Sequence, residues 1–576
     1  MKKTVGIFVI SLLLMFALPR CVGDFLEISP KGVLSEDILL DPEDIEGFII
    51  SAYSWPHKAY FTESLHPCYY GCIRSDDSYK GGGGGLGDQI GWLQMEVFSE
   101  ATPNINNFDY TWQGGYKGIK RCNIALQQLA KVSETEFPAK EQRIAEMKFL
   151  RGYQYHSLKN AYRWIPYIDE NLAENEYSNV PNHPENMTES DLWQRILDDF
   201  ADAYEVLPET QADKGRPTKY AAEAFMVKIL LWMAFEMNEN HQVININEQR
   251  LQEALQHCDN IINSHRYDLC DDYGQMFWCE SDNNTPESIF EFQCTTDDGT
   301  EGWSTNVGVR LNTPTWAPYT TCCDFHKMSY DYINANRTGA DGLPLFDTYN
   351  DAELKNNPAY WTSNTFDPRL CHTAAIPGIP YCYNTSLLYD SVGTVYPQHF
   401  GYIHSMKELV NPFSSCQYKQ RGNSKNWKVI RYSEILLWKA EILIKLGREN
   451  EALPIINEIR ERAANSIYRF ADGTPVLNFY IQPYVDGVNC DWTNDFAWEA
   501  VIWETRLEFA GEGRRFFDLV RWGIAEDVMN AHFNKEKLRL EWMEPGFFTT
   551  GRDEFLPIPQ NQIVWSQGKF VQNPGY

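Results

Sequence analysis

Four stretches of the chain place apolar residues three to five positions apart, the spacing of one helix face. They cover residues 139–163, 191–207, 218–237 and 429–464. Thr218 stands where a helix N-cap is expected, and the second stretch ends at Pro208, which cannot continue a helix. The pattern therefore predicts several well-formed helices.

Residues 429–464 contain the clearest two-helix unit. The first half stops at Gly447, a residue that readily adopts the left-handed conformation of a helix C-cap, and the apolar spacing resumes from Ala452 to Ile459. Ala440 and Ala452 are small enough for close contact between two helices. The unit predicts a hairpin of the tetratricopeptide type, although the strict repeat of about 34 residues is not visible.

Two long segments, residues 68–118 and 265–425, lack a sustained period and are rich in Gly, Pro, Asn, Asp and aromatic residues. Such long connections are usually functional surfaces or disordered, and the aromatic content favours ordered functional loops. The run Gly81–Gly85 predicts a mobile loop tip, because five consecutive glycines pay a large entropic cost to hold one conformation.

The N-terminus predicts export. Two lysines precede an apolar run from Val5 to Leu18, which is short for a membrane span and typical of a secretory signal covering residues 1–20. Cys21 follows three positions after Leu18, as in the lipobox of bacterial lipoproteins, although Arg20 departs from the small residue of that pattern. Lipidation of Cys21 is the expectation, and a plain cleavage site with a soluble product is the alternative.

Charge and cysteine content narrow the partners. The chain has 50 Lys+Arg and 79 Asp+Glu, a net charge of −29, and a surface this acidic repels nucleic-acid phosphates. Of the 14 cysteines, 13 remain after Cys21 is set aside, so at least one thiol stays free if all disulfides are intramolecular. Cys68/Cys72 and Cys371/Cys382 are candidate pairs by proximity in the sequence.

No motif anchors catalytic or cofactor chemistry. A P-loop, an HExxH zinc motif, paired CxxC motifs and a GxSxG elbow are all absent from the sequence. Glu504 and Glu508 have the spacing of one helix face, but Arg506, Arg514, Arg515 and Arg521 surround them, which favours an ion-pair network over catalysis. Oxygen-bearing residues from Asn334 to Asp341 lack the distal glutamate of a calcium loop and predict a solvated turn. We expect no cofactor and no metal.

Aromatic residues in the irregular segments are the more informative signal. Flat rings stack on the weakly polar face of a sugar, and neighbouring Asn, Asp and Arg side chains bind its hydroxyls. The aromatic residues concerned are Trp92, Trp278, Trp303, Trp316, Tyr319, Trp361 and Tyr381. For any single ring, packing beneath its loop is the alternative. The set predicts carbohydrate recognition.

Several segments occur in an order that is informative as a whole. After Cys21, Asp24-Phe25-Leu26-Glu27 and Pro30 form an acidic-Phe-Leu-acidic-x-x-Pro stretch. The later segments are YKGIKRCNIAL (116–126), EMKFLRGYQYHSLKNAYRWIPYI (146–168), GRPTKYAAEAFMVKILLWMA (215–234), ESIFEFQ (287–293), FDPRL (366–370), RYSEILLWKAEILIKLG (431–447), NEIRERA (457–463), WETRLEFAGEGRRFFDLVRWG (503–523), FLPIPQNQI (555–563) and NPGY (573–576). In this order they resemble the SusD/RagB family of outer-membrane nutrient-binding lipoproteins.

The resemblance implies an all-α fold in which tetratricopeptide-like hairpins form a superhelical scaffold with long irregular ligand-binding loops. Residues 21–576 would be one domain, with the scaffold mainly at 110–264 and 426–530 and the ligand face mainly at 68–110 and 265–425. The family implies surface exposure on the outer membrane through a lipid on Cys21, and a SusC-like TonB-dependent transporter as partner. Family members capture glycans or other oligomeric nutrients and are not enzymes.

Binding residues do not carry over from the family by motif, so the site rests on side-chain chemistry. Trp303, Trp316 and Tyr319 are the predicted stacking platforms, Trp92 with Asp76 belongs to the early loop, and Trp361 is an outlier. A peptide or glycoprotein nutrient, a glycan-cleaving enzyme and a purely structural partner of the transporter are the alternatives.

Overall fold

The computed structural model describes residues 42–56, 68–279, 285–296, 298–299, 305–306, 309–315, 323–355, 357–391, 394–418 and 422–576. The predicted signal segment and the predicted lipidation site Cys21 lie outside these residues. In the part of the chain that is described, no helix combines the length and the apolar run needed to cross a bilayer.

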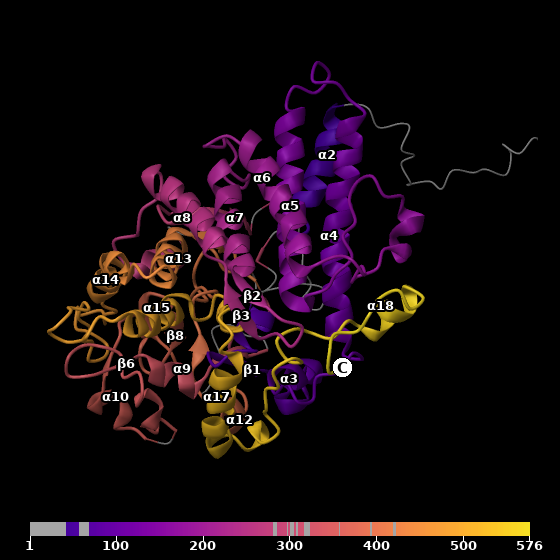
Figure 1. Cartoon of the computed structure of the whole chain (residues 1–576). Helices are drawn as coiled ribbons and strands as arrows, with labels where there is room; N and C mark the ends of the chain where they lie inside the picture. Colours follow the sequence, from indigo (N-terminus) through magenta and orange to yellow (C-terminus); the bar gives the residue numbers. More distant parts are fainter. Residues whose placement is uncertain are drawn as a thin grey trace, which may run out of the picture.

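Long helices dominate the first half of the chain and return after residue 431. They are α2 (Pro42–Tyr53), α4 (Asn106–Ala130), α5 (Lys140–Tyr162), α6 (Glu189–Val206), α7 (Lys219–Ala234), α8 (Glu248–Asn263), α13 (Tyr432–Lys445), α14 (Glu449–Asn465), α15 (Asn494–Phe509) and α17 (Ala525–Arg539). Helix α4 packs on α5, α6 on α7 and α13 on α14, while α13 also packs on α8 and so joins the two groups (Figure 1). These hairpins confirm the predicted all-α, tetratricopeptide-like scaffold.

Single residues set several helix ends and contacts. Thr218 Oγ1 accepts a hydrogen bond from the backbone N–H of Ala221 at 3.3 Å, so the predicted N-cap of α7 is present. Gly447 has φ +71° just after α13, which confirms its predicted C-cap conformation. A Cβ on Gly115 of α4 would lie 2.6 Å from the Leu158 side chain of α5, so only glycine allows this close approach.

Two predicted helices are shorter than their apolar patterns. The stretch 218–237 is helical only to Ala234, because β2 (Phe235–Met237) pairs with β3 (Val243–Ile246). The unit 429–464 begins with β12 (Trp427–Arg431), which pairs with β4 (Ser288–Phe292) before α13 starts. In both cases the backbone N–H and C=O groups of these residues bond to a partner strand instead of to the next turn of a helix.

Short elements fill the remainder of the described chain. The short helical turns are η3 (Cys68–Cys72), η4 (Gly85–Gly87), α3 (Ile90–Glu96), η5 (Glu174–Asn179), η6 (Tyr273–Phe277), α9 (Tyr330–Ala335), η8 (Tyr349–Asp351), α10 (Tyr360–Ser363), α11 (Arg369–Thr373), α12 (Pro397–Phe400), α16 (Arg515–Arg521), η10 (Glu541–Met543) and α18 (Gln560–Trp565). The short strands are β1 (Ser78–Gly81), β5 (Phe325–Met328), β6 (Arg337–Thr338), β7 (Thr365–Phe366), β8 (Ala374–Ala375), β9 (Pro380–Tyr381), β10 (Asn384–Leu388) and β11 (His404–Ser405).

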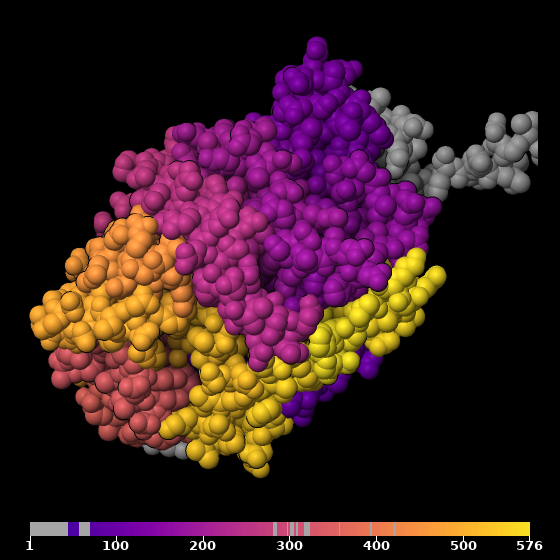
Figure 2. All heavy atoms as spheres, in the orientation of Figure 1, coloured from indigo at the N-terminus to yellow at the C-terminus, as the bar shows by residue number. Residues whose placement is uncertain are grey.

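The strands form one four-stranded sheet of order β1-β5-β11-β8 and several two-stranded ladders. Their neighbours α9, α10 and α12 lie at the bottom of the view in Figure 1, away from the long helices α5 to α8. One buried apolar cluster nevertheless extends from Ile45 in α2 through Phe325 of the sheet to Phe570 near the C-terminus. On the outside of the molecule, the C-terminal residues, yellow in Figure 2, lie against the purple and magenta surface of the long helices.

Candidate functional site

The two irregular segments predicted to form a ligand face meet in the four-stranded sheet. Strand β1 comes from the first segment, and β5, β11 and β8 come from the second. Tyr79 of β1 lies opposite Lys327 of β5, and Lys327 lies opposite His404 of β11. We call the described residues of 68–110 and 265–425 the loop-rich face.

The glycine run forms a turn whose first residues are paired at the edge of this sheet, which argues against the predicted mobile tip. The N–H of Gly82 donates to the Asp324 carbonyl at 3.0 Å, and Gly81 and Gly82 are buried. Gly81 has φ +73°, and a Cβ there would lie 2.5 Å from the Asp324 oxygen. Glycine is needed here for backbone approach, and backbone pairing offsets its entropic cost.

The Lys80 side chain binds the backbone of the glycine turn. Its Nζ donates to the carbonyls of Gly85 at 3.3 Å and Asp88 at 2.5 Å, and it lies 5.3 Å from the ring centre of Phe325. Burial lowers the pKa of the Lys80 ammonium to about 8, although the nearby Glu96 carboxylate opposes this shift. The Lys80 ammonium therefore binds backbone carbonyls of the turn and stabilises its conformation.

Tyr396 is an exposed aromatic residue on this turn that the sequence analysis missed. The Val395 N–H donates to Asp324 Oδ2 at 2.9 Å, which brings the segment to the sheet edge. A Cβ on Gly85 would lie 3.4 Å from the Tyr396 ring, so the ring rests on the glycine turn. Tyr396 is 38% exposed and Tyr402, after α12, is 42% exposed. Both tyrosines stand beside Pro or Gly in the sequence, and this setting could have identified them as candidate ligand contacts.

Backbone strain concentrates around the same place. Asp324, His326 and Tyr396 have positive φ values of 62°, 61° and 54°, which non-glycine residues rarely adopt. His326 Nδ1 lies 2.6 Å from Glu408 Oε1. Burial alone would raise the pKa of Glu408, yet His326 and the Ser405 hydroxyl lower it to about 2. Strained backbone held by buried polar contacts is typical of functional sites.

The early-loop residues Asp76 and Trp92 are structural, which corrects their prediction as ligand contacts. Asp76 is 1% exposed and accepts hydrogen bonds from Arg515 Nε at 2.9 Å and Nη2 at 3.0 Å. Burial alone would raise the pKa of Asp76, but Arg506 and Arg515 hold it well below its usual value. Trp92 is also 1% exposed and lies edge-on to Phe325 at 5.5 Å. Neither side chain is accessible to a ligand in this structure.

The other predicted aromatics divide into two groups. Trp303, Trp316 and Tyr319 lie outside the described residues, so their role stays a prediction. The chain that flanks residues 316–322 is anchored at the glycine turn, because the N–H of Gly83 donates to the Cys323 carbonyl. Trp361 on α10 is half-buried, with its ring centre 5.7 Å from that of Phe366, and α10 lies apart from α3 and α12 (Figure 1).

Packing also decides the remaining aromatic and cysteine predictions. Tyr381 is buried against Tyr389, with ring centres 5.4 Å apart, and Trp278 is half-buried against Tyr383.

A disulfide links the two ends of the second irregular segment. Cys279 and Cys416 form it across 137 positions. The predicted pair Cys371/Cys382 is wrong, because both are buried thiols in the core, and the Cys68 side chain lies outside the described part.

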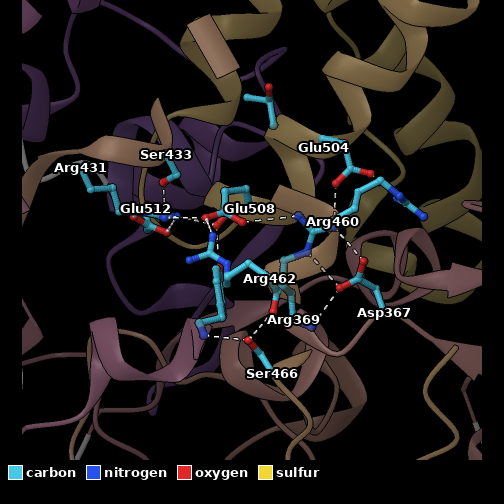
Figure 3. A network of polar contacts seen from close by, with 12 residues as sticks. Asp367, Arg369, Arg431, Ser433, Arg460, Arg462, Ser466, Glu504, Glu508 and Glu512 are labelled. Atoms are coloured by element: carbon cyan, nitrogen blue, oxygen red, sulfur yellow. Dashed lines mark hydrogen bonds and ion pairs between the residues drawn. The ribbon is translucent and has the colours of Figure 1, made fainter. Parts of the chain in front are cut away.

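Glu504 and Glu508 are buried in an ion-pair network, as predicted, but their arginine partners come from other elements (Figure 3). Arg369 Nη2 lies 2.8 Å from Glu504 Oε2, and Arg431 Nη1 lies 2.6 Å from Glu508 Oε1. Arg462 also pairs with Glu508. These carboxylates join the loop-rich face to the scaffold and are inaccessible to a substrate.

One trio in the described part of the chain has the spacing of metal ligands, namely Asp331, His532 and Glu536. Arg506 Nη2 donates to Asp331 Oδ1 at 2.7 Å, and Arg539 Nη1 donates to Glu536 Oε1 at 2.7 Å. Guanidinium groups thus already pair with both carboxylates, and the trio forms part of a buried ion-pair cluster. The predicted solvated turn from Asn334 to Asp341 is present only at its end: Asn334 and Asn336 are wholly buried, whereas Asp341 is exposed in a turn.

Comparisons with known proteins cover nearly the whole chain. A family model described as SusD family matches residues 286–576, and one described as starch-binding associating with outer membrane matches residues 87–231. The curated "SusD-like protein P2" of Formosa agariphila is 22% identical over 605 residues, which cover 100% of both chains.

Solved structures show the same fold. Surface glycan-binding protein A from Bacteroides fluxus is 21% identical with a TM-score of 0.66, covering 93% of this chain and 99% of that chain. Surface glycan-binding protein A from Bacteroides thetaiotaomicron in complex with laminarihexaose is 21% identical with a TM-score of 0.58, covering 92% and 99%. The overall fold is thus shared over more than nine tenths of this chain.

Proposed function

Because the chain belongs to the SusD family, we propose that it is a cell-surface lipoprotein that binds glycans and delivers them to a SusC-like TonB-dependent outer-membrane transporter. The match of the family model over residues 286–576 confirms the resemblance that was read from the sequence. The observation that carries the proposal is the fold shared over 92% of the chain with a protein solved in complex with laminarihexaose.

The proposed glycan site is the edge of the loop-rich face at the glycine turn. Tyr396 offers an exposed ring there, and Tyr402 offers another one after α12. Trp303, Trp316 and Tyr319 fall within the sequence range 265–425 and are proposed as further contacts. Sugar rings stack on such side chains, while the carboxylates and amides of the face bind hydroxyl groups. The paired carboxylates Glu504 and Glu508, the candidate catalytic pair, are buried. We therefore propose binding without catalysis.

The lipid on Cys21 would anchor the protein to the outer membrane, and hairpins of the helical scaffold would face the transporter. The family model for residues 87–231, described as starch-binding associating with outer membrane, supports the association with that membrane. Radiolabelled palmitate incorporation that is lost in Cys21→Ala tests the anchor. Co-purification with a co-expressed transporter tests the partner, and a chain that never co-purifies contradicts delivery.

Affinity gel electrophoresis tests the glycan site. The chain without residues 1–21 is run through gels that contain laminarin, starch, or host and microbial polysaccharides. We expect retardation by at least one class, and Trp303→Ala or Trp316→Ala should weaken binding by about 1–3 kcal/mol, the scale of aromatic hot spots. Tyr480→Ala, which removes an exposed ring outside both segments, is the matched control.

Other outcomes identify the alternatives. Unchanged affinity in both tryptophan variants removes Trp303 and Trp316 from the site. Binding of a peptide digest without any polysaccharide favours a peptide nutrient, and release of reducing sugar from a bound glycan reveals an enzyme. Binding to the transporter alone identifies a structural partner.

A further inference from the structure

A concave surface, lined by no described residue of 68–110 or 265–425, lies between the middle of α4 and the C-terminal segment. It has a volume of about 440 Å³. Helix α4 forms its floor, η5 forms one side, and α18 with Phe570 forms the other. Figure 1 shows α18 beside α4 at the right of the view, and Figure 2 shows the yellow C-terminal atoms against the purple surface. We call this surface the C-terminal groove.

A continuous run of aromatic rings lines the C-terminal groove. The ring centres of Tyr116 and Trp112 are 5.3 Å apart, those of Trp112 and Phe570 are 5.7 Å apart, and those of Phe570 and Trp565 are 6.1 Å apart. Trp112 and Phe570 are buried, whereas Trp565 is 50% exposed and Tyr116 is half-buried. The two buried rings therefore support two accessible rings at either end.

Polar groups stand beside these rings. Gln113, Lys117 and Lys120 line the α4 floor, and Glu174 and Tyr177 line the η5 side. Lys120 Nζ lies 2.5 Å from Glu174 Oε1, so this pair joins the floor to one wall. The charges of Lys120 and Glu174 compensate one another, and the ammonium, amide and hydroxyl groups of Lys117, Gln113 and Tyr177 suit a ligand with many hydroxyl groups.

The buried carboxylate of Asp109 fixes the side of the groove that α18 forms. Asp109, near the start of α4, accepts hydrogen bonds from Gln113 at 3.0 Å, Asn561 at 3.0 Å and Gln562 at 2.6 Å. Asn561 and Gln562 belong to α18, so Asp109 holds the helix that carries Trp565 against α4. The groove is thereby preorganised, which reduces the entropic cost of binding.

Shape and chemistry together identify the ligand class. The volume falls within the range of roughly 300–1,000 Å³ for small-molecule sites, whereas a protein partner is usually held by a broader, flatter surface. A purely apolar ligand would desolvate Lys120 and Glu174 without replacing their hydrogen bonds. A sugar presents an apolar ring face to the aromatic residues and hydroxyl groups to the polar ones.

We propose that the C-terminal groove binds a sugar unit of the glycan, as a second site separate from the loop-rich face. The inference rests on the proposed glycan-binding function. Two separated sites on one chain would hold one polysaccharide by avidity, because binding at the second site becomes intramolecular after the first.

Fluorine NMR of protein labelled with 5-fluorotryptophan tests the second site directly. Trp565→Phe assigns the resonance of Trp565 by its loss, and the labelled protein is titrated with laminarihexaose and with maltohexaose. We expect the Trp565 resonance to shift and saturate with at least one of them. In laminarin or starch gels, Trp565→Ala should weaken retardation about fivefold or more, the scale of an aromatic contact, while Tyr480→Ala should not.

The outcomes separate this inference from the proposed function. If other tryptophan resonances shift and that of Trp565 does not, the second site is wrong and glycan binding at the loop-rich face stands. If the Trp565 resonance responds only to a peptide digest, the groove binds peptide and the inference is overturned. If no saccharide shifts any resonance or retards the protein, the proposed function fails and the second site fails with it. Circular dichroism checks that Trp565→Ala is folded.

Discussion

The helical scaffold and the loop-rich face of this protein are stabilised over different sequence ranges. In the scaffold, partners such as Gly115 and Leu158 lie on neighbouring helices of one hairpin. In the loop-rich face, Asp76 pairs with Arg515 across 439 positions, and Cys279 forms a disulfide with Cys416 across 137 positions. In these examples the scaffold is stabilised by contacts between neighbouring helices, whereas the face is stabilised by contacts between distant segments of the chain.

Figure 3 shows where the two regions meet. Glu508 of α15 pairs with Arg369 from the loop-rich face and with Arg431 and Arg462 from the scaffold side. Burial alone would raise the pKa of Glu508, but these three arginines hold it well below its usual value. Removing one charge at this junction should therefore affect both regions at once.

The largest effect is expected for Glu508→Gln. The substitution leaves buried guanidinium groups without their shared carboxylate, and we expect a loss of roughly 3–5 kcal/mol in the free energy of unfolding. Thermal unfolding of purified protein measures it, with soluble yield as the readout if the variant does not fold. Glu451→Gln in the scaffold is the control, because its partner Arg448 is exposed and the loss should be small. Equal stability of the two variants would contradict the role of the junction.

The disulfide Cys279–Cys416 should stabilise the loop-rich face and leave the scaffold unaffected. Closing a loop of this length lowers the entropy of the unfolded chain, so Cys279→Ser should cost about 2–4 kcal/mol. Limited proteolysis followed by mass spectrometry should show earlier cleavage within residues 265–425. Cleavage that begins in α4–α8 would show that the disulfide does not act locally.

Matched glycine substitutions sharpen the comparison further. Gly81→Ala forces a Cβ into the Asp324 carbonyl at positive φ, and we expect a loss of about 1–3 kcal/mol. Gly447→Ala, at a similar φ but with no atom within 4 Å of its Cβ, should lose about 1 kcal/mol. Thermal unfolding of both variants measures the difference. A Gly81→Ala variant as stable as Gly447→Ala would restore the mobile-tip interpretation.

The smallest effect is a pH dependence of opposite sign at two histidines. Burial alone would lower the pKa of His532, but Asp331 and Glu536 raise it, so its stabilising contribution is present below the unfolded value of about 6.5. That contribution is lost as pH rises through the raised folded pKa. Burial lowers the pKa of His372, so its contribution is present above the unfolded value and is lost as pH falls through the folded pKa.

Melting temperatures of His532→Asn and His372→Asn between about pH 5 and 8.5, the range of histidine titration, test these signs. The difference from the unsubstituted protein should shrink with rising pH for His532→Asn and shrink with falling pH for His372→Asn. Parallel curves for the two variants would show that neither histidine titrates as its surroundings require.

The sequence was informative wherever stabilisation is local. The periodicity of residues 139–163 and the cap at Thr218 predicted helices that the structure confirms. It was misleading where a distant partner decides: the glycines at 81–85 read as mobile because Asp324 was not visible as their partner. Asp76 read as a ligand contact for the same reason, since Arg515 lies 439 positions away.

For the candidate site, residue type predicted the region and exposure selected the residues. Aromatic residues among Gly and Pro marked residues 68–110 and 265–425, and the structure joins these segments in one sheet. Trp92 and Tyr396 satisfied similar sequence criteria, yet Trp92 packs into the core and Tyr396 stays accessible. Which ring faces solvent depends on side-chain packing between distant segments, which a local pattern does not contain.

By itself, the sequence determined the helical scaffold, the acidic character and the family of this protein. Periodicity depends on neighbouring residues, and charge and the order of motifs are read along the chain without knowledge of which segments touch. Only the tertiary structure decided that the glycine turn pairs with Asp324, that Glu504 and Glu508 bind distant arginines, and that α18 closes a groove on α4. These features depend on contacts between segments far apart in the chain, and such contacts exist only once the scaffold has brought those segments together.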